Sequence, residues 1–111
     1  MAKSCVLIVF SNPAEGREDE YNEWYSHQHL ADVLRVPGFK SAQRFKIPQD
    51  DPAAQWKYLA IYEFEADDPA EALKALTARA GTPDMVISQA MDLQAYSVAP
   101  WVAVTDKLIA R

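Results

Sequence analysis

The stretch YNEWYSHQHLAD, residues 21–32, lies at the centre of a longer segment, residues 12–45, that decides how this chain folds. Both histidines of the protein lie in it. On a helix of about 3.6 residues per turn, residues spaced by three and four share one face. A helix that only fills a core buries Leu, Ile, Val and Ala along that face. Here the face combines aromatic rings with an amide, an imidazole and a carboxylate, which favours a small-molecule site: Tyr21, Trp24, Tyr25, Gln28, His29 and Asp32.

The second half of this helix carries a different pattern. Leu30, Val33 and Leu34 project from another side of an ideal helix than Trp24 and Tyr25 do. We therefore expect a kink, or the start of a new short helix, near the second histidine. Its imidazole would then lie at a helix end. The Pro-Gly pair at 37–38 predicts a type II turn that closes the segment.

Four apolar segments around these helical residues predict strands. Residues 5–10 are rich in Val and Ile, which is typical of a buried strand, and the Asn-Pro pair at 12–13 predicts a turn after it. Residues 56–65 and 93–104 predict two further strands. Residues 39–47 alternate, so that one face holds Phe39, Ser41, Gln43, Phe45 and Ile47 and the other holds Lys40, Ala42, Arg44 and Lys46.

A second helix starts at the sequence Asp68-Pro69-Ala70-Glu71. The aspartate is a good cap, proline fits the first turn, and the glutamate completes the spacing of a capping box. Gly81 ends this helix. The triplet Thr82-Pro83-Asp84 predicts another, short helix that carries Met85, Val86, Ala90 and Met91.

The order strand, helix, strand, strand, helix, strand over 111 residues predicts a single α+β domain, residues 1–111, with the ferredoxin-like plan: an antiparallel sheet with two helices on one face. The strands are apolar on both sides. A monomer would therefore expose more than the few hundred Å² of contiguous apolar surface that is usual. We expect a homodimer in which two sheets pack face to face across a two-fold axis.

Composition excludes several classes of function. A net charge of -5 argues against nucleic acid or an anionic membrane as partner. No apolar run approaches the roughly 20 residues of a membrane span, and the N-terminus lacks the features of a signal peptide. A single cysteine, Cys5, predicts a buried apolar side chain in a cytoplasmic protein. We expect no metal and no cofactor, since His27 and His29 point about 200° apart on a helix and no glycine-rich phosphate loop is present.

Residues 12–45 contain a set of short motifs that can be compared with known families: Asn12-Pro13, Tyr21-Asn22-Glu23-Trp24-Tyr25, His29-Leu30, Asp32-Val33-Leu34, Val36-Pro37-Gly38-Phe39 and Arg44-Phe45. With them the chain resembles the dimeric α+β barrel superfamily and, within it, proteins grouped with the ethyl tert-butyl ether degradation protein (EthD). Their first helix carries an aromatic pair and then a histidine before a Pro-Gly-Phe turn. This superfamily includes lactone isomerases, polyketide cyclases, cofactor-free monooxygenases and heme enzymes.

The resemblance also implies roles for residues. Where a histidine of the first helix works in relatives, it transfers protons, and the matching residue here is His29. Heme-degrading relatives bind iron through a histidine of the second long helix. Residues 69–80 contain no histidine, which argues against a heme enzyme.

Four residues are the candidate catalytic groups. His29, with an ordinary pKa of about 6.5, can act as acid or base near neutrality. Tyr25 or Asp32 could hold its ring by a hydrogen bond. Arg44 could hold a carboxylate or enolate oxygen with its planar fork, although an ion pair at a surface or a dimer interface explains it equally well. A histidine that caps a helix end remains the alternative for His29.

Four more residues are expected to line the substrate pocket: Trp24, Gln28, Phe45 and Tyr62. Packing in the core is the alternative for Trp24 and Tyr62.

Two hypotheses of function follow. The first is a cofactor-independent isomerase, cyclase or lyase that moves a proton on a small hydrophobic or aromatic metabolite. The second is a non-catalytic protein that binds such a metabolite; a cofactor-free monooxygenase is a further possibility.

Overall fold

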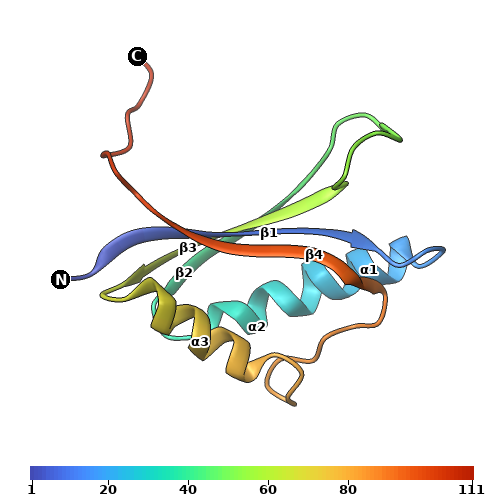
Figure 1. Cartoon of the computed structure of the whole chain (residues 1–111), viewed down its shortest axis with the longest axis horizontal. Helices are drawn as coiled ribbons and strands as arrows, with labels where there is room; N and C mark the ends of the chain where they lie inside the picture. The colour runs from blue at the N-terminus through green and yellow to red at the C-terminus, as the bar shows by residue number, and fades with distance from the viewer.

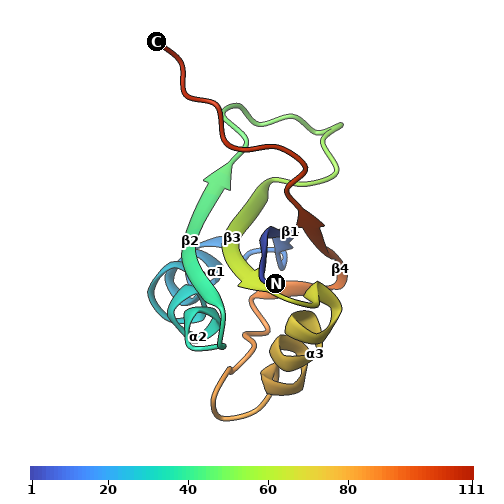
Figure 2. The same cartoon turned by 90° about the vertical axis from the view of Figure 1, so that its left-hand side faces the viewer.

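The computed structural model describes the whole chain, residues 1–111, and contains a four-stranded antiparallel sheet with helices on one face (Figure 1). The strands are β1 (Lys3–Pro13), β2 (Phe39–Lys46), β3 (Tyr58–Ala66) and β4 (Met91–Val102), in the spatial order β2-β3-β1-β4. The turned view in Figure 2 shows the first helical segment beside β2 and the second beside β4. The ferredoxin-like α+β fold is therefore confirmed.

The first helical segment is continuous and consists of α1 (Glu18–Trp24), η1 (Tyr25–His29) and α2 (Leu30–Leu34). The middle piece is a π-helical turn, in which the Leu30 N–H donates to the Tyr25 carbonyl, five residues earlier. The break predicted near His29 takes this form. His29 consequently lies inside a continuous helix, and the expectation that it lies at a helix end is wrong.

Strand β2 contains a β-bulge, which the alternation of polar and apolar residues in its sequence did not predict. Phe39 pairs with Phe64, and Ser41 pairs with the adjacent residue Glu63, so Lys40 is the extra residue on β2. The bulge turns Phe39 toward the helices, where its ring stacks on Phe64 with centroids 4.8 Å apart. The prediction that Phe39 shares a face with Ser41 is therefore wrong. Arg44 lies on the helix side of the sheet.

The second helix, α3 (Pro69–Arg79), begins as predicted, with the Asp68 carboxylate accepting a hydrogen bond from the Ala70 N–H at 3.0 Å. The Glu71 carboxylate pairs with Lys74 instead of completing a capping box. No helix follows Gly81: the residues up to β4 form turns. The Gly81 N–H donates to the Met85 carbonyl at 2.8 Å, which folds this connection back on itself.

The predicted turn at 12–13 is also displaced, because both residues extend β1 and the chain turns at Gly16, whose φ is +75°.

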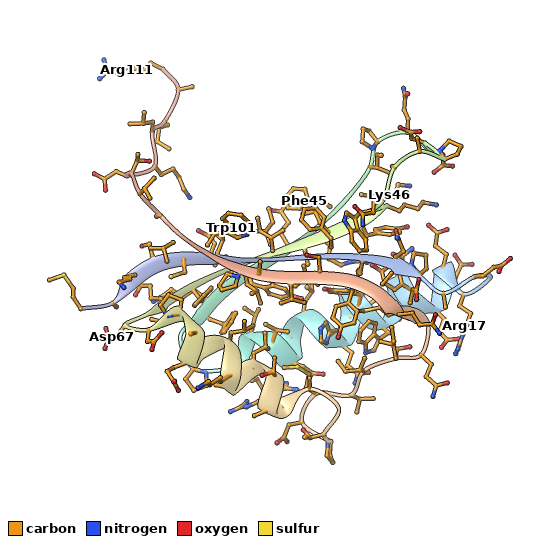
Figure 3. The ribbon with its side chains drawn as sticks, viewed as in Figure 1. Arg17, Phe45, Lys46, Asp67, Trp101 and Arg111 are labelled. Atoms are coloured by element: carbon orange, nitrogen blue, oxygen red, sulfur yellow. The ribbon has the colours of Figure 1, made fainter.

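The core lies between the helices and the sheet and contains 17 buried apolar residues. The other sheet face has no helix on it, and the β2–β3 loop and the C-terminal residues rise on that side (Figure 1). Phe45 and Trp101 point to it in Figure 3. No helix is long and apolar enough to cross a membrane.

Candidate functional site

A cavity of about 170 Å³ lies between the helices and the sheet. Its size is close to that of the dry cavities, on the order of 150 Å³, that hold a benzene ring in proteins. Of the 15 residues that line it, 13 are hydrophobic, and none carries a permanent charge. They are Leu7, Val9, Tyr25, His29, Val33, Tyr62, Leu76, Thr77, Ala80, Met85, Ile87, Met91, Leu93, Tyr96 and Val98.

His29 is the one imidazole in this lining. Its ring stacks on Trp24 with centroids 4.6 Å apart, and its other neighbour, Tyr25, meets it edge-on at 4.9 Å. The Nδ1 atom is buried and has no hydrogen-bond partner. Burial lowers the pKa of His29 to about 4, while the charge of Asp32 acts in the opposite direction. At neutral pH the imidazole is therefore uncharged and can accept a proton.

Asp32 is buried, with 5% of its surface exposed, and does not line the cavity. Its carboxylate forms an ion pair with Arg35, whose carbonyl in turn accepts a hydrogen bond from Arg79 at 3.3 Å. The expected hydrogen bond to His29 is absent. Asp32 acts on the imidazole through its charge.

Two of the three tyrosines that line the cavity, Tyr25 and Tyr62, are buried, whereas Tyr96 is 51% exposed. The Tyr62 hydroxyl donates to the Tyr25 hydroxyl at 3.3 Å, and the proton of Tyr25 itself has no acceptor in the protein. Burial raises the pKa of Tyr25 to about 12 and that of Tyr62 well above its ordinary value. Both hydroxyls therefore stay protonated at neutral pH and act as hydrogen-bond donors.

Arg44 lies behind this pair, outside the cavity. Its guanidinium carbon is 4.7 Å from the centre of the Tyr25 ring and 5.2 and 5.0 Å from those of Tyr21 and Tyr58. Its nitrogens donate to the Ser26 hydroxyl at 2.8 Å and to the Asn22 side-chain oxygen at 3.0 Å. Arg44 thus holds tyrosine rings by cation–π contacts, and no carboxylate pairs with it.

The other expected pocket residues lie away from the cavity. Trp24 is buried and donates from Nε1 to the Val86 carbonyl at 3.1 Å. Gln28 is exposed on the outside of the helix. Phe45 is 42% exposed on the opposite face of the sheet (Figure 3). His27 is exposed and lies 3.7 Å from Glu23, as expected for a surface residue.

The sequence reasoning did not assign three important lining residues to the site. Met85 comes from the connection after α3 and Met91 is the first residue of β4, although a short helix was expected to carry both; Tyr96 lies farther along β4. A signal for Tyr96 exists in the register, because it pairs with buried Ser11 and so faces the helices. Nothing in the local pattern around the two methionines indicates that they approach the first helix.

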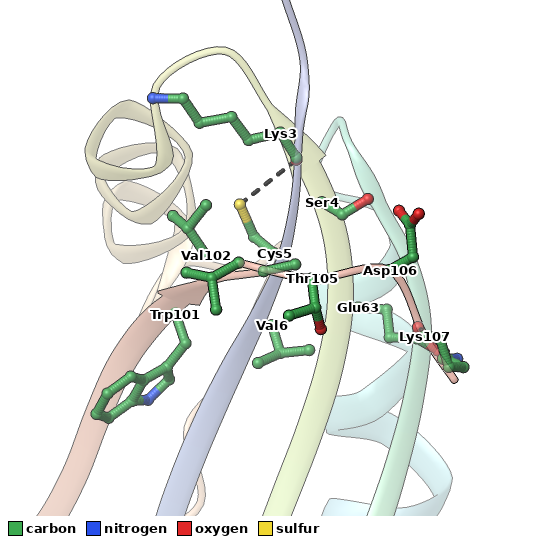
Figure 4. Close-up of a pocket in the computed structure, with 12 residues that line it drawn as sticks. Lys3, Ser4, Cys5, Val6, Glu63, Trp101, Val102, Thr105, Asp106 and Lys107 are labelled. Atoms are coloured by element: carbon green, nitrogen blue, oxygen red, sulfur yellow. Dashed lines mark hydrogen bonds and ion pairs between the residues drawn. The ribbon is translucent and has the colours of Figure 1, made fainter. Parts of the chain in front are cut away.

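A second, larger hollow of about 980 Å³ is open to solvent between the start of β1, the end of β4 and the C-terminal residues (Figure 4). It contains no histidine. The Cys5 thiol donates to the Lys3 carbonyl at 3.4 Å, and burial raises the pKa of this thiol. The thiol is thus protonated and unreactive at neutral pH. No three His, Cys, Asp or Glu side chains cluster as metal ligands do.

Comparison with known proteins gives a family and a fold. A family model described as a domain of unknown function (DUF4286) matches residues 4–76. Over 48 residues the chain is 38% identical to core atranone cluster (CAC) protein 1 of Stachybotrys chlorohalonatus, which covers 43% of this chain and 20% of that protein. The chain thus spans about a fifth of the length of this curated relative.

Three solved structures share the fold over nearly the whole chain. A candidate monooxygenase from Shewanella loihica has a TM-score of 0.58 at 16% identity, with 95% of this chain and 98% of that chain covered. A mutant of MhuD with two manganese protoporphyrin IX molecules per active site has a TM-score of 0.59 at 20% identity (93% and 97% covered). An EthD family protein from Bacillus halodurans has a TM-score of 0.52 at 16% identity (88% and 95% covered). The predicted resemblance to EthD-like proteins is confirmed at the level of the fold.

Proposed function

The chain belongs to the DUF4286 family, and from that premise we propose that it is a cofactor-independent enzyme that moves a proton on a small hydrophobic or aromatic molecule. One observation carries the proposal: His29, neutral and with a buried nitrogen that no protein group uses, lines an apolar cavity. Unpaired buried polar atoms are rare in proteins, and they are retained most often where a ligand or reaction uses them.

The residues around His29 suit such a reaction. The neutral imidazole accepts a proton from a carbon or hydroxyl of the bound molecule. The negative charge of Asp32 then stabilises the imidazolium that forms, because it raises the pKa of His29. The Tyr25 hydroxyl, which itself accepts a hydrogen bond from Tyr62, donates a hydrogen bond to the oxygen on which negative charge develops. The apolar lining lowers the polarity around His29, which strengthens both interactions.

A porphyrin, as bound by MhuD, does not suit this cavity. Pockets for drug-sized ligands measure about 300–1,000 Å³, whereas this cavity measures about 170 Å³. In addition, α3 carries no histidine at any position from Pro69 to Arg79. The site therefore favours chemistry on a small molecule by the side chains themselves.

Proton transfer can be tested before the natural substrate is known. Small lactones, cyclic ketones and phenols would be incubated with the protein in D₂O, and hydrogen–deuterium exchange at carbon would be followed by NMR. We expect His29→Ala to slow the exchange about a hundredfold or more. His27→Ala is the matched control, because this exposed histidine lies two residues away and outside the cavity. Exchange that is equally fast in His29→Ala would refute the proposal.

A non-catalytic binding protein is the second candidate, and the almost wholly apolar lining of the cavity favours it. Native mass spectrometry of the purified protein would then find a bound metabolite that remains unchanged on incubation. Oxygen consumption with a phenol would instead identify a cofactor-free monooxygenase.

We also propose that the chain forms a homodimer through the uncovered face of its sheet. That face presents large apolar side chains: Trp101 is 59% exposed and Phe45 is 42% exposed. The C-terminal residues beside it include apolar side chains that are nearly free of contacts, with Val104 94% and Leu108 91% exposed. A second copy would bury both surfaces. Sedimentation equilibrium would measure the mass in solution, and a monomer at high micromolar concentration would contradict this assignment.

A further inference from the structure

We propose that the cavity selects an uncharged molecule of about one ring with a single oxygen, and that this oxygen accepts a hydrogen bond from the Tyr25 hydroxyl. The inference rests on the proposed function, because it defines the substrate class of the same site. Three properties of the cavity lead to it: the volume, the absence of charged lining residues, and the small number of unused polar atoms.

Volume limits the ligand first. About 170 Å³ accommodates one six-membered ring with a short substituent and little more. The buried part of the lining cannot easily make room, since Leu7, Tyr62 and Met85 are each only 1% exposed, whereas the cavity is open beside β4, where Tyr96 is 51% exposed. A molecule of two fused rings that reaches His29 would have to displace core residues or leave one ring in water beside β4, and both are unfavourable.

Charge limits the ligand next. A carboxylate in an apolar cavity needs a cation beside it, because an unpaired buried charge is very unfavourable. Arg44 was the expected partner, but its guanidinium lies behind the Tyr25 ring and donates to Asn22 and Ser26. No Lys or Arg lines the cavity. No Asp or Glu lines it either, so a cation would also be unpaired, and the bound molecule must therefore enter without charge.

Unused polar atoms determine the functional group. Thr77 lines the cavity, but its hydroxyl is already bonded to the carbonyls of Leu73 and Lys74, each at 3.1 Å. The Tyr62 hydroxyl donates to Tyr25, whose own proton is free. Tyr96 also lines the cavity, but it is 51% exposed, so water can bond its hydroxyl. One buried donor thus remains beside the imidazole of His29, so a ligand with one oxygen, such as a phenol or a cyclic ketone, satisfies the site.

Four probes test these limits by titration calorimetry: phenol, benzene, benzoate and 2-naphthol. We expect phenol to bind most tightly, and benzoate and 2-naphthol to bind at least about tenfold more weakly. In Tyr25→Phe, phenol should lose about tenfold in affinity while benzene is unchanged, since only the hydrogen bond is removed. Tyr62→Phe keeps the donor of Tyr25 and should retain phenol. Tyr58→Phe is the control, because its hydroxyl bonds Glu18 outside the cavity.

Equal affinity for phenol and benzoate, equal affinity for phenol and 2-naphthol, or no change for phenol in Tyr25→Phe would each overturn the inference. Thermal unfolding of each variant verifies that it is folded. The outcomes separate this inference from the proposed function, because probe binding requires no turnover. If His29→Ala abolishes proton exchange but the probes do not discriminate, the substrate class is wrong and the proposed function stands. If the protein discriminates among the probes but catalyses no proton exchange, the substrate class stands and the proposed function is wrong.

Discussion

The two faces of strand β1 differ in how they are covered and in what they can do. Leu7 is 1% exposed and faces the helices, where it lines the cavity, whereas its neighbour Ile8 faces the uncovered side of the sheet and is only half-buried. The covered face carries buried tyrosines, an imidazole and an arginine among its apolar residues. The uncovered face is mainly apolar and presents the side chains of Phe45 and Trp101.

This difference suggests that the covered face serves ligand binding and chemistry, whereas the uncovered face serves association with another chain. Polar groups are costly to bury, so their presence under the helices indicates a specific use. Apolar groups at a surface need only to be covered, and many partners can do that. Changes on the covered face should therefore affect folding and ligand binding, while changes on the uncovered face should affect association.

The largest effect should come from emptying the covered face of β1. Leu7→Ala should lower the free energy of unfolding by about 2–5 kcal/mol, because it leaves a void in the core. Ile8→Ala, measured at dilutions where the chain is monomeric, should cost less than about half as much. Urea denaturation followed by circular dichroism gives both values. Equal losses would mean that the two faces are equally packed in one copy of the chain.

Next in size is the pH dependence that His29 imposes on stability. Its pKa in the folded protein is about 4, below the ordinary value of 6.5, so the unfolded chain takes up a proton first. The free energy of unfolding should therefore fall by roughly 2–3 kcal/mol as the pH drops from about 6.5 to about 4. In His29→Gln this slope should be absent, while His27→Ala should keep it. A slope that persists in His29→Gln would point to another buried group.

A smaller effect should follow from a change on the uncovered face. Trp101→Ser should raise the dissociation constant of the proposed dimer about tenfold or more, since exposed tryptophans often dominate interfaces. Phenol binding in the cavity should not change. Leu34→Ser is a suitable control, because this leucine is 38% exposed on the helical side. Analytical ultracentrifugation measures the constants, and equal effects of the two changes would argue against this interface.

The smallest effect concerns Arg44, which lies on the covered face but outside the cavity. Arg44→Gln removes cation–π contacts and should lower stability by about 1–2 kcal/mol. The pKa of Tyr25 should also rise further, because the charge of Arg44 lowers it in the native protein. Absorbance titration of tyrosinate, with Tyr25→Phe as reference, detects this shift. An unchanged titration would show that Arg44 only supports the packing of the rings.

The sequence predicted the order of the elements and the tyrosine-rich face of the sheet because both depend on local periodicity. Tyr58, Ala60, Tyr62 and Phe64 alternate in β3 and are all buried. It did not predict the direction of Phe39, because one extra residue, Lys40, shifts the alternation at a bulge. A bulge is decided by the pairing of two strands, and the sequence of one strand does not show it.

The candidate site was predicted less completely than the fold. His29, Tyr25 and Tyr62 do line one cavity, but Gln28 and Phe45 do not. Helical spacing brings Gln28 near the aromatic residues on an ideal helix, whereas the π-helical turn changes the spacing at that point. Trp24 and Tyr25 pack on His29 from its own segment, but the cavity lining beside it also includes residues of β4 and of the connection after α3. These are more than 50 residues away in the sequence, and nothing in the segment of His29 indicates them.

The wide turn at Tyr25–His29 also indicates how this helix could have been altered in evolution. A π-helical turn contains one residue more than the α-helix needs to cover the same length. Deleting a single residue there would restore an ordinary helix and leave the residues after it in place, because the wide turn absorbs the extra residue locally. Val33 would then stay in the core, whereas the side chains of the turn itself, His29 among them, would change direction. Gain or loss of one codon is thus enough to make or remove the imidazole's place beside the cavity, with the sheet left intact.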